Sequence, residues 1–150
     1  MASLWSGSDP KPERRVRASQ SDWAGIHQMF EHHSCVHCGL PHQSLHHILP
    51  RSQGGDDIID NLAPLCGDGT RGCHGILESH APGWERVAAS VRQYVIVSNE
   101  RRHYQEDHAG ESFNRRYPPL ANMDQQFLDD RAKIFESQFG IREVEGNEAA

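Results

Sequence analysis

Residues 35–80 read CVHCGLPHQSLHHILPRSQGGDDIIDNLAPLCGDGTRGCHGILESH and contain the chain's four cysteines. Cys35 and Cys38 are separated by two residues, the spacing at which two thiolates grip one zinc ion, and a glycine follows to permit the tight turn. Cys66 and Cys73 have six residues between them, GDGTRG, whose three glycines let the loop fold back. We therefore expect four thiolates to hold one structural zinc ion; the alternative is that Cys66 and Cys73 are merely buried small residues.

Disulfide bonds are the other use of paired cysteines. The N-terminal residues lack the apolar middle of a secretory signal. We therefore expect a cytoplasmic protein, in a reducing compartment where such cysteines bind metal. The hydrophobic fraction of 36% is low for 150 residues, which predicts a small core supported in part by a metal.

The pattern between the cysteine pairs predicts a strand, a loop, a second strand and a helix. Residues 45–48 are suitable for the first strand, residues 50–55 are rich in turn formers, residues 63–66 suit the second strand, and a helix begins at residue 72. Neighbours on a strand point to opposite faces, so one of His46 and His47 could bind a metal while the other faces a substrate, but only if the strand is distorted locally.

At this level of detail the segment resembles the HNH endonuclease family, and in particular the HNH proteins of bacteriophages and their hosts. The matching elements, in order, are CVHCG, LHHILPRSQGG, DNLAPLC and GCHG. The resemblance implies an α+β fold: a small ββα-metal (His-Me finger) module stapled by a four-cysteine zinc site, with flanking helices. It implies a nuclease that hydrolyses DNA with the help of a divalent metal ion.

The resemblance also implies a role for each matching residue. His47 takes the position of the general base that activates water, and His46 takes that of a metal ligand. Asn61 resembles the asparagine that orients the base or its loop and that touches the metal in some relatives. His74 resembles the last histidine of the family, a second metal ligand. The implied cofactors are structural Zn and a catalytic Mg, Mn or other divalent ion.

The chemistry agrees with these roles. Neutral imidazole can take a proton from water near pH 7, and a divalent ion can stabilise the charge that develops on the phosphate and the leaving oxygen. Glu78 follows His74 by four residues, so a helix would place both on one face, and a carboxylate is a reasonable third ligand. The alternative is a solvent-exposed glutamate. His80 would point elsewhere on that helix.

Other polar residues of the segment are open to two interpretations. Arg51 could bind a substrate phosphate or be a solvated loop residue. We expect the histidines near the first cysteine pair to lie at the surface and the loop aspartates to be structural. These residues are His32, His33, His37 and His42, and Asp56, Asp57 and Asp60.

The rest of the chain predicts tails and helices. We expect a disordered basic tail at 1–20, the nuclease module with a leading helix at 21–82, a helical extension at 83–140 and a disordered acidic tail at 141–150.

Within these regions, Ser21 or Asp22 could cap the leading helix, and apolar spacing predicts a helix at 84–97, with a strand at YVIV as the alternative. The charged residues 99–119 are typical of a linker, and a last helix is expected to end near Gly140.

The formal net charge of −6 argues against a protein that coats nucleic acid by bulk charge, but it permits local phosphate contacts. We expect double-stranded DNA as the partner, and residues 81–140 could also recruit a DNA-processing partner such as a phage packaging enzyme. A non-catalytic zinc-binding module for nucleic acid or protein is the alternative function. An RNA-directed nuclease or toxin is a third hypothesis with weaker support. No membrane segment is expected, and no sequence feature indicates an oligomeric state.

Overall fold

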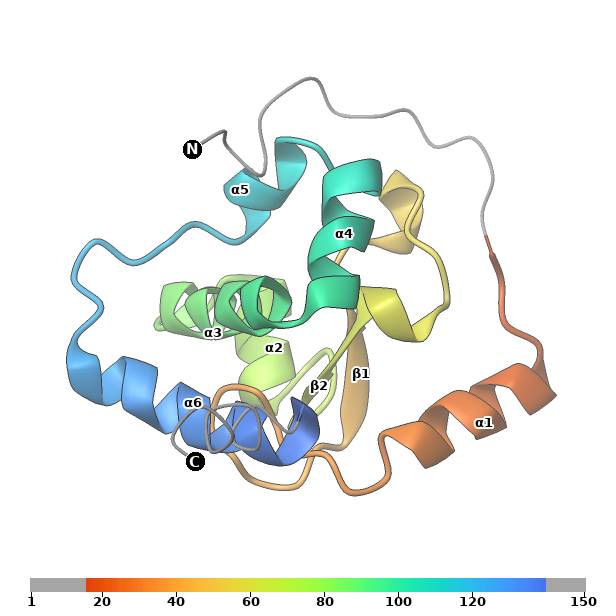
Figure 1. The fold of residues 1–150 in the computed structure, drawn as a ribbon, viewed down its shortest axis with the longest axis horizontal. Helices are drawn as coiled ribbons and strands as arrows, with labels where there is room; N and C mark the ends of the chain where they lie inside the picture. The colour runs from red at the N-terminus through yellow and green to blue at the C-terminus, as the bar shows by residue number, and fades with distance from the viewer. Residues whose placement is uncertain (1–15, 140–150) are drawn as a thin grey trace, which may run out of the picture.

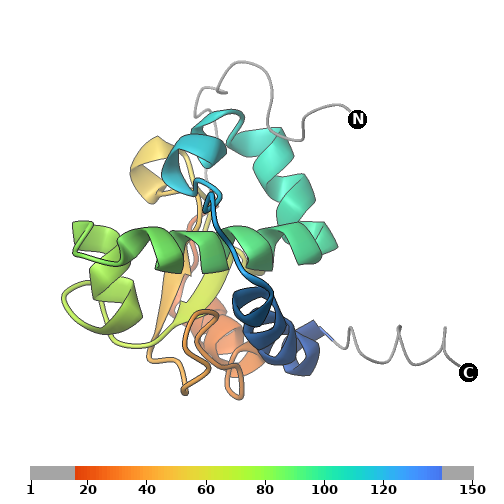
Figure 2. The same ribbon diagram turned by 90° about the vertical axis from the view of Figure 1, so that its left-hand side faces the viewer.

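The computed structural model describes residues 16–139 and has the expected α+β architecture. Two short strands pair, and helices surround them (Figures 1 and 2). Strand β1 (Ser44–His47) runs antiparallel to β2 (Leu62–Leu65), with His46 opposite Ala63 and His47 opposite Leu62. Helix α2 (Gly72–Ser79) follows β2, so the predicted order of strand, loop, strand and helix is confirmed.

The loop between the strands carries two short 3-10 helices, η1 (Arg51–Gln53) and η2 (Ile59–Asn61). The buried side chain of Asn61 closes this loop by hydrogen bonds to its backbone. Its amide oxygen accepts from the backbone N–H of Leu49 at 2.8 Å, and its amide nitrogen donates to the carbonyls of Leu49 and Asp56. A buried amide with every bond made fixes a loop firmly, because breaking any one bond leaves a desolvated polar group.

Helix α1 (Gln20–Met29) begins earlier than expected, because its cap lies two residues before Ser21 and three before Asp22, the caps considered from the sequence. Ser19 is the N-cap: its hydroxyl accepts from the Asp22 N–H, and the Asp22 carboxylate accepts from the Ser19 N–H, which forms a capping box. Ile26 and Phe30 pack with Leu62 against the strands.

The segment that precedes α1 also belongs to the fold. The Val16 N–H donates to Asp56 and the Ala18 N–H donates to Asp57, so residues 16–20 do not extend the expected tail. The remainder of that tail, 1–15, and the acidic tail lie outside the described residues.

Helix α3 (Trp84–Val97) crosses the centre of the molecule, as Figures 1 and 2 both show, and the alternative strand at YVIV is wrong. Its larger buried side chains, Val87, Val91, Tyr94 and Val95, recur at helical spacing and join residues of the ββα unit in one core. Helix α6 (Gln125–Phe139), capped by Asp124, packs beside α3. The core spans both the ββα unit and the helices after it, and its largest members include Ile48, Leu65, Val91, Tyr94 and Phe113.

Residues 99–119 were expected as a linker, and that expectation is wrong. They form α4 (Asn99–His108) and α5 (Ser112–Arg116). The apolar pattern is missing because α4 buries polar side chains whose ends are paired with the strand region. These bonds run from Arg101 Nε to Leu62 O at 2.9 Å, from Tyr104 Oη to Asp56 Oδ2 at 2.8 Å and from Gln105 Nε2 to Asn61 Oδ1 at 2.9 Å.

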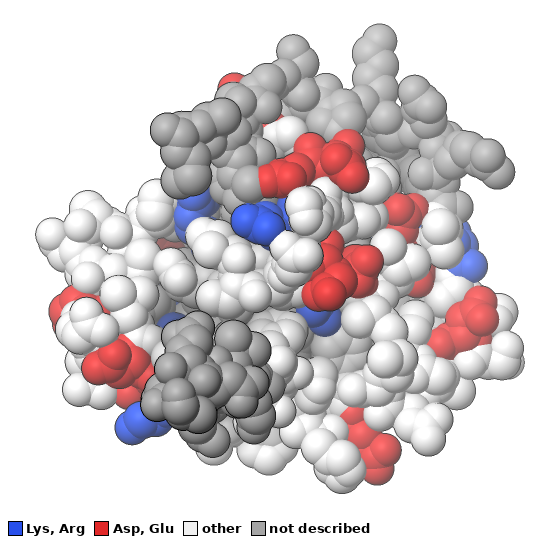
Figure 3. All heavy atoms as spheres, viewed as in Figure 1, with Lys and Arg blue, Asp and Glu red and all other residues white. Residues whose placement is uncertain are grey.

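Across the described residues, every helix is too short or too polar to cross a membrane. The face of Figure 1 carries scattered groups of carboxylates and few exposed basic side chains, as Figure 3 shows for the described part of the chain.

Gly55 provides a test of how tightly the loop packs on Asn61. A Cβ at this position would lie 1.8 Å from the Leu49 carbonyl oxygen and 2.9 Å from Asn61 Nδ2. The Leu49 backbone could move aside only by distorting the loop. Gly55→Ala should therefore lower the free energy of unfolding by about 3 kcal/mol, as measured by urea denaturation. Gly69→Ala is the control, since a Cβ there meets nothing within 4 Å. Equal midpoints for the two variants would contradict this packing.

Candidate metal centres and catalytic site

The four cysteines come together from three parts of the fold. Cys35 and Cys38 lie on a tight turn in which the Gly39 N–H donates to the Cys35 carbonyl, with Gly39 at a φ of 81°. Cys66 follows β2, and Cys73 lies in the first turn of α2. Their sulfur atoms all lie within 4.8 Å of one another. The fold therefore brings Cys66 and Cys73, for which the sequence left two interpretations open, together with Cys35 and Cys38.

The glycine-rich insert achieves this by folding back on itself. Gly67 and Gly72 have φ values of 78° and 71°. A Cβ on Gly67 would lie 2.1 Å from the Arg71 carbonyl oxygen. These two positions need glycine both for the left-handed backbone and for the close approach.

The sulfur geometry fits a zinc ion. Thiolates at ~2.3 Å from a tetrahedral zinc lie about 3.8 Å apart, and the Sγ atoms of Cys38 and Cys66 are 3.6 Å apart. The hydrogen bond from Cys73 lowers the pKa of Cys35 to about 4, whereas burial raises the pKa of Cys38 to about 11. The four thiols therefore do not ionise together by themselves, and a bound cation is what would allow four thiolates.

A second cluster comprises His46, His74 and Glu78, whose ligand atoms also lie within 4.8 Å of one another. His74 and Glu78 are one helical turn apart on α2 and face His46 on β1. Glu78 Oε2 lies 3.0 Å from His46 Nδ1 and 3.4 Å from His74 Nε2. The structure thus brings together the three residues expected as ligands of a catalytic ion. His80 lies outside this cluster, and its ring stacks on that of Trp84.

Tyr117 determines which nitrogen of His46 faces the cluster. The Tyr117 hydroxyl donates its one hydrogen to the Ile48 carbonyl at 2.6 Å, so its oxygen accepts from His46 Nε2 at 2.7 Å. The proton of neutral His46 therefore lies on Nε2, and Nδ1 presents a lone pair to the cluster. Burial lowers the pKa of His46 and favours this neutral form.

Ser44 has the same effect on His74. Its hydroxyl donates to the Gly67 carbonyl at 2.8 Å and therefore accepts from His74 Nδ1 at 2.7 Å. His74 Nε2 is then the unprotonated nitrogen. Ser44 and His46 share one face of β1, because residues two apart on a strand point the same way.

Three acceptor atoms therefore converge. The third acceptor is Glu78 Oε2, which lies 3.0 Å from His46 Nδ1 and 3.4 Å from His74 Nε2. A proton can join only two of the three atoms, whereas one divalent ion can bind all three. The donor set of two imidazoles and one carboxylate suits such an ion.

His47 points to the opposite face of β1, as strand alternation predicts. Its Nε2 lies 2.9 Å from Oδ1 of the buried Asp57, and its ring meets Trp23 of α1 edge to face. Asp57 also accepts from the Ala18 N–H, and Arg51 and Arg17 lie 3.4 Å from it. Burial lowers the pKa of His47, while the hydrogen bond to Asp57 opposes this shift. With the proton held on Nε2, Nδ1 is the basic nitrogen of the ring.

Asn61 is part of the loop and does not belong to the cluster of His46, His74 and Glu78. Its bonds to Leu49 and Asp56 hold the loop that carries Asp57. Arg51, considered as a phosphate ligand, has a side chain that is 55% exposed and lies beside Asp57.

The sequence interpretation missed three residues that touch the site: Asp57, Ser44 and Tyr117. Ser44 could have been found, because it lies two residues before His46 on the expected strand. Asp57 was assigned only a structural role. Tyr117 gave no signal, since 71 positions separate it from His46. The surface assignment of the flanking histidines holds for His32 but is wrong for His33, His37 and His42, which are half-buried.

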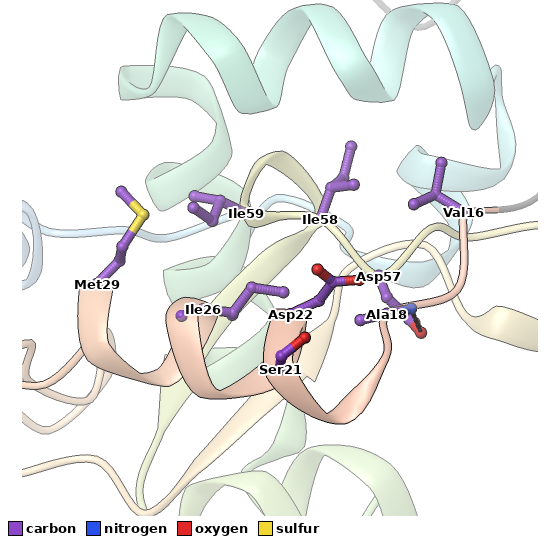
Figure 4. Close-up of a pocket in the computed structure, with 10 residues that line it drawn as sticks. Val16, Ala18, Ser21, Asp22, Ile26, Met29, Asp57, Ile58 and Ile59 are labelled. Atoms are coloured by element: carbon purple, nitrogen blue, oxygen red, sulfur yellow. Dashed lines mark hydrogen bonds between the residues drawn. The ribbon is translucent and has the colours of Figure 1, made fainter.

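A cavity of about 570 Å³ lies between α1 and the residues before η2, away from the metal cluster. Figure 4 shows Ile26, Met29, Ile58 and Ile59 along it, with Asp57 at one wall. Its mostly aliphatic lining offers no metal ligands comparable to those of the three-residue cluster.

The zinc site can be tested by removing one ligand. Cys38→Ala should lose zinc and unfold, because an apparent binding free energy of about 10 kcal/mol is part of the folding free energy of such domains. Zinc content by mass spectrometry and thermal melting by circular dichroism measure the two effects. Leu40→Ala is the control, since this exposed side chain lies on the same turn. A Cys38→Ala protein that melts like the wild type would refute a structural zinc site.

Comparison with known proteins agrees with the geometry. The model of the HNH endonuclease family matches residues 35–77, which include the four cysteines, His46, His47, Asn61 and His74. Searches of curated proteins and of solved structures returned no match. The match, the ββα order and the cysteine cluster confirm the resemblance seen in the sequence, and residues 35–77 of this chain are an HNH endonuclease domain.

Proposed function

We propose that this protein is a metal-dependent endonuclease that hydrolyses phosphodiester bonds in double-stranded DNA. One observation carries the proposal: β1 contributes to a candidate cation site on one face and presents His47, oriented by Asp57, on the other. A zinc-binding module that only recognises a partner needs neither a second cation site nor an oriented histidine. The HNH domain supports a nucleic acid as the substrate.

In this proposal His47 is the general base. Its hydrogen bond to Asp57 keeps the proton on Nε2, so that Nδ1 can take a proton from the attacking water. Asp57 is a positioning residue, because it fixes the ring and stabilises the imidazolium that forms. Asn61 acts indirectly: it donates to the Asp56 carbonyl and so holds the loop that positions Asp57 against His47.

His46, His74 and Glu78 would hold the divalent ion. When bound, the ion supplies a Lewis acid that stabilises charge on the phosphate and on the leaving oxygen. Two imidazoles and one carboxylate suit a divalent transition-metal ion better than Mg²⁺, which prefers oxygen ligands, and Mn²⁺ binds to either kind of donor. Tyr117 and Ser44 keep the two imidazoles in the tautomers that binding requires. The second ion, zinc, would be structural.

The proposal assigns different roles to two parts of the chain. We propose that residues 21–82 act as the nuclease module and that the helices after residue 83 support it through a shared core. Arg51 lies near His47 and can contact a substrate phosphate if it turns from Asp57. The broader setting that we propose is DNA processing in the cytoplasm of a bacterium or a phage-infected cell, with a packaging enzyme as one possible type of partner.

The role of His47 can be tested by nicking of supercoiled plasmid with Mn²⁺ or Mg²⁺. His47→Ala should cut at least about 10²-fold more slowly, because no other side chain replaces the base, and it should keep its zinc. His32→Ala is the control, since His32 is exposed and apart from the site. If no divalent ion enables the wild type to nick plasmid, the non-catalytic alternative is supported; if His47→Ala cuts normally, the base is another group.

The role of Tyr117 can be tested by titrating Mn²⁺ into the zinc-loaded protein in a calorimeter. Tyr117→Phe should bind Mn²⁺ about tenfold or more weakly, because the bond that fixes the His46 tautomer is lost. Tyr94→Phe removes a hydroxyl that is buried and has no hydrogen bond within the described residues, so its affinity should stay unchanged. Unaltered Mn²⁺ affinity in Tyr117→Phe would show that this hydroxyl does not position a ligand.

A further inference from the structure

A cavity of about 110 Å³ adjoins the candidate cation site on the side of α5. Two of the three candidate ligands, His46 and Glu78, form part of its wall. Its other lining residues are Pro50, Leu77, His80, Arg116 and Tyr117. The cavity is well below the roughly 300–1,000 Å³ of sites that enclose drug-sized molecules. It has room for a small group that reaches the cluster.

The wall opposite β1 comes from α5, outside the segment that matches the HNH family. This short helix is anchored to α3. Arg92 donates to Asn114 Oδ1 and to the Tyr117 carbonyl, each at 2.9 Å, and Phe113 is fully buried. The backbone that carries Arg116 and Tyr117 therefore has a defined place beside the cluster.

Arg116 supplies the fixed positive charge of this cavity. Its guanidinium donates through Nη1 to Gln53 Oε1 on η1, and it lies against the phenol of Tyr117. The residue as a whole is half-buried, although its Nε and Nη2 atoms are buried. The ring of His80, another lining residue, stacks on that of Trp84 with centroids 4.1 Å apart.

We propose that this cavity binds a phosphate group of the DNA backbone beside the candidate cation site, with Arg116 as the residue that contacts it. The inference rests on the proposed nuclease function and extends it to a residue outside the HNH domain. A guanidinium matches the planar pair of oxygens that a phosphate presents. In a chain of net charge −6, affinity for DNA depends on such local cations.

The test measures binding of a short fluorescent DNA duplex by anisotropy, over a series of salt concentrations. The protein is full-length and zinc-loaded, with no further divalent ion, so that contacts of the chain itself are observed. Arg116→Gln should weaken binding about fivefold and reduce the slope of log K against log salt by about one, as expected for one lost phosphate contact.

Two matched variants separate phosphate contact from structural effects. Arg115→Gln removes the same charge from the neighbouring, exposed position, which does not line the cavity, and should weaken binding less than twofold. Gln53→Ala removes the loop partner of Arg116 but keeps the guanidinium, and it should keep the wild-type salt slope. If Gln53→Ala weakens binding as much as Arg116→Gln does, Arg116 only anchors the loop and the proposal is overturned.

The outcomes also separate this inference from the nuclease function. A wild type that binds and cuts DNA, with an Arg116→Gln variant of equal affinity and slope, overturns the phosphate site and leaves the nuclease intact. A wild type that neither binds nor cuts DNA overturns both.

Discussion

The alternation of side chains along β1 is the constraint on which the rest of the site depends. Four residues divide into two pairs: Ser44 and His46 face α2, while Leu45 and His47 face α1. A shift by one residue would exchange the two faces and destroy both the acceptor cluster and the bond to Asp57. The pairing of His46 with Ala63 and of His47 with Leu62 therefore needs firm support.

That support comes from both ends of the hairpin. The cysteine cluster ties the end of β2 and the first turn of α2 to the turn at Cys35. At the other end, Asn61 closes the loop, and Gln105 of α4 donates to its amide oxygen. The helices after the HNH domain thus do more than cover a surface. They satisfy polar groups that the small hairpin cannot satisfy from its own residues.

Much of this could be predicted from local sequence. The spacing of Cys35 and Cys38, the adjacent histidines and the four-residue step from His74 to Glu78 each encode geometry over a few residues, and the structure has all of them. The linker prediction for 99–119 failed because α4 buries Arg101 and Gln105, whose charges and amides hide a helix from any apolar pattern. Tyr117 could not be predicted, because only tertiary packing brings it to His46.

The bond between Tyr117 and His46 also limits how this domain can be exchanged between proteins. Residues 35–77 would be the natural unit to transplant, yet a chimaera cut there would leave His46 without the group that sets its tautomer. It would also expose the apolar side of α2, which packs on α3. The smallest transferable unit therefore extends at least to Tyr117, and recombination within residues 78–117 would separate the candidate ligands from the residues that orient them.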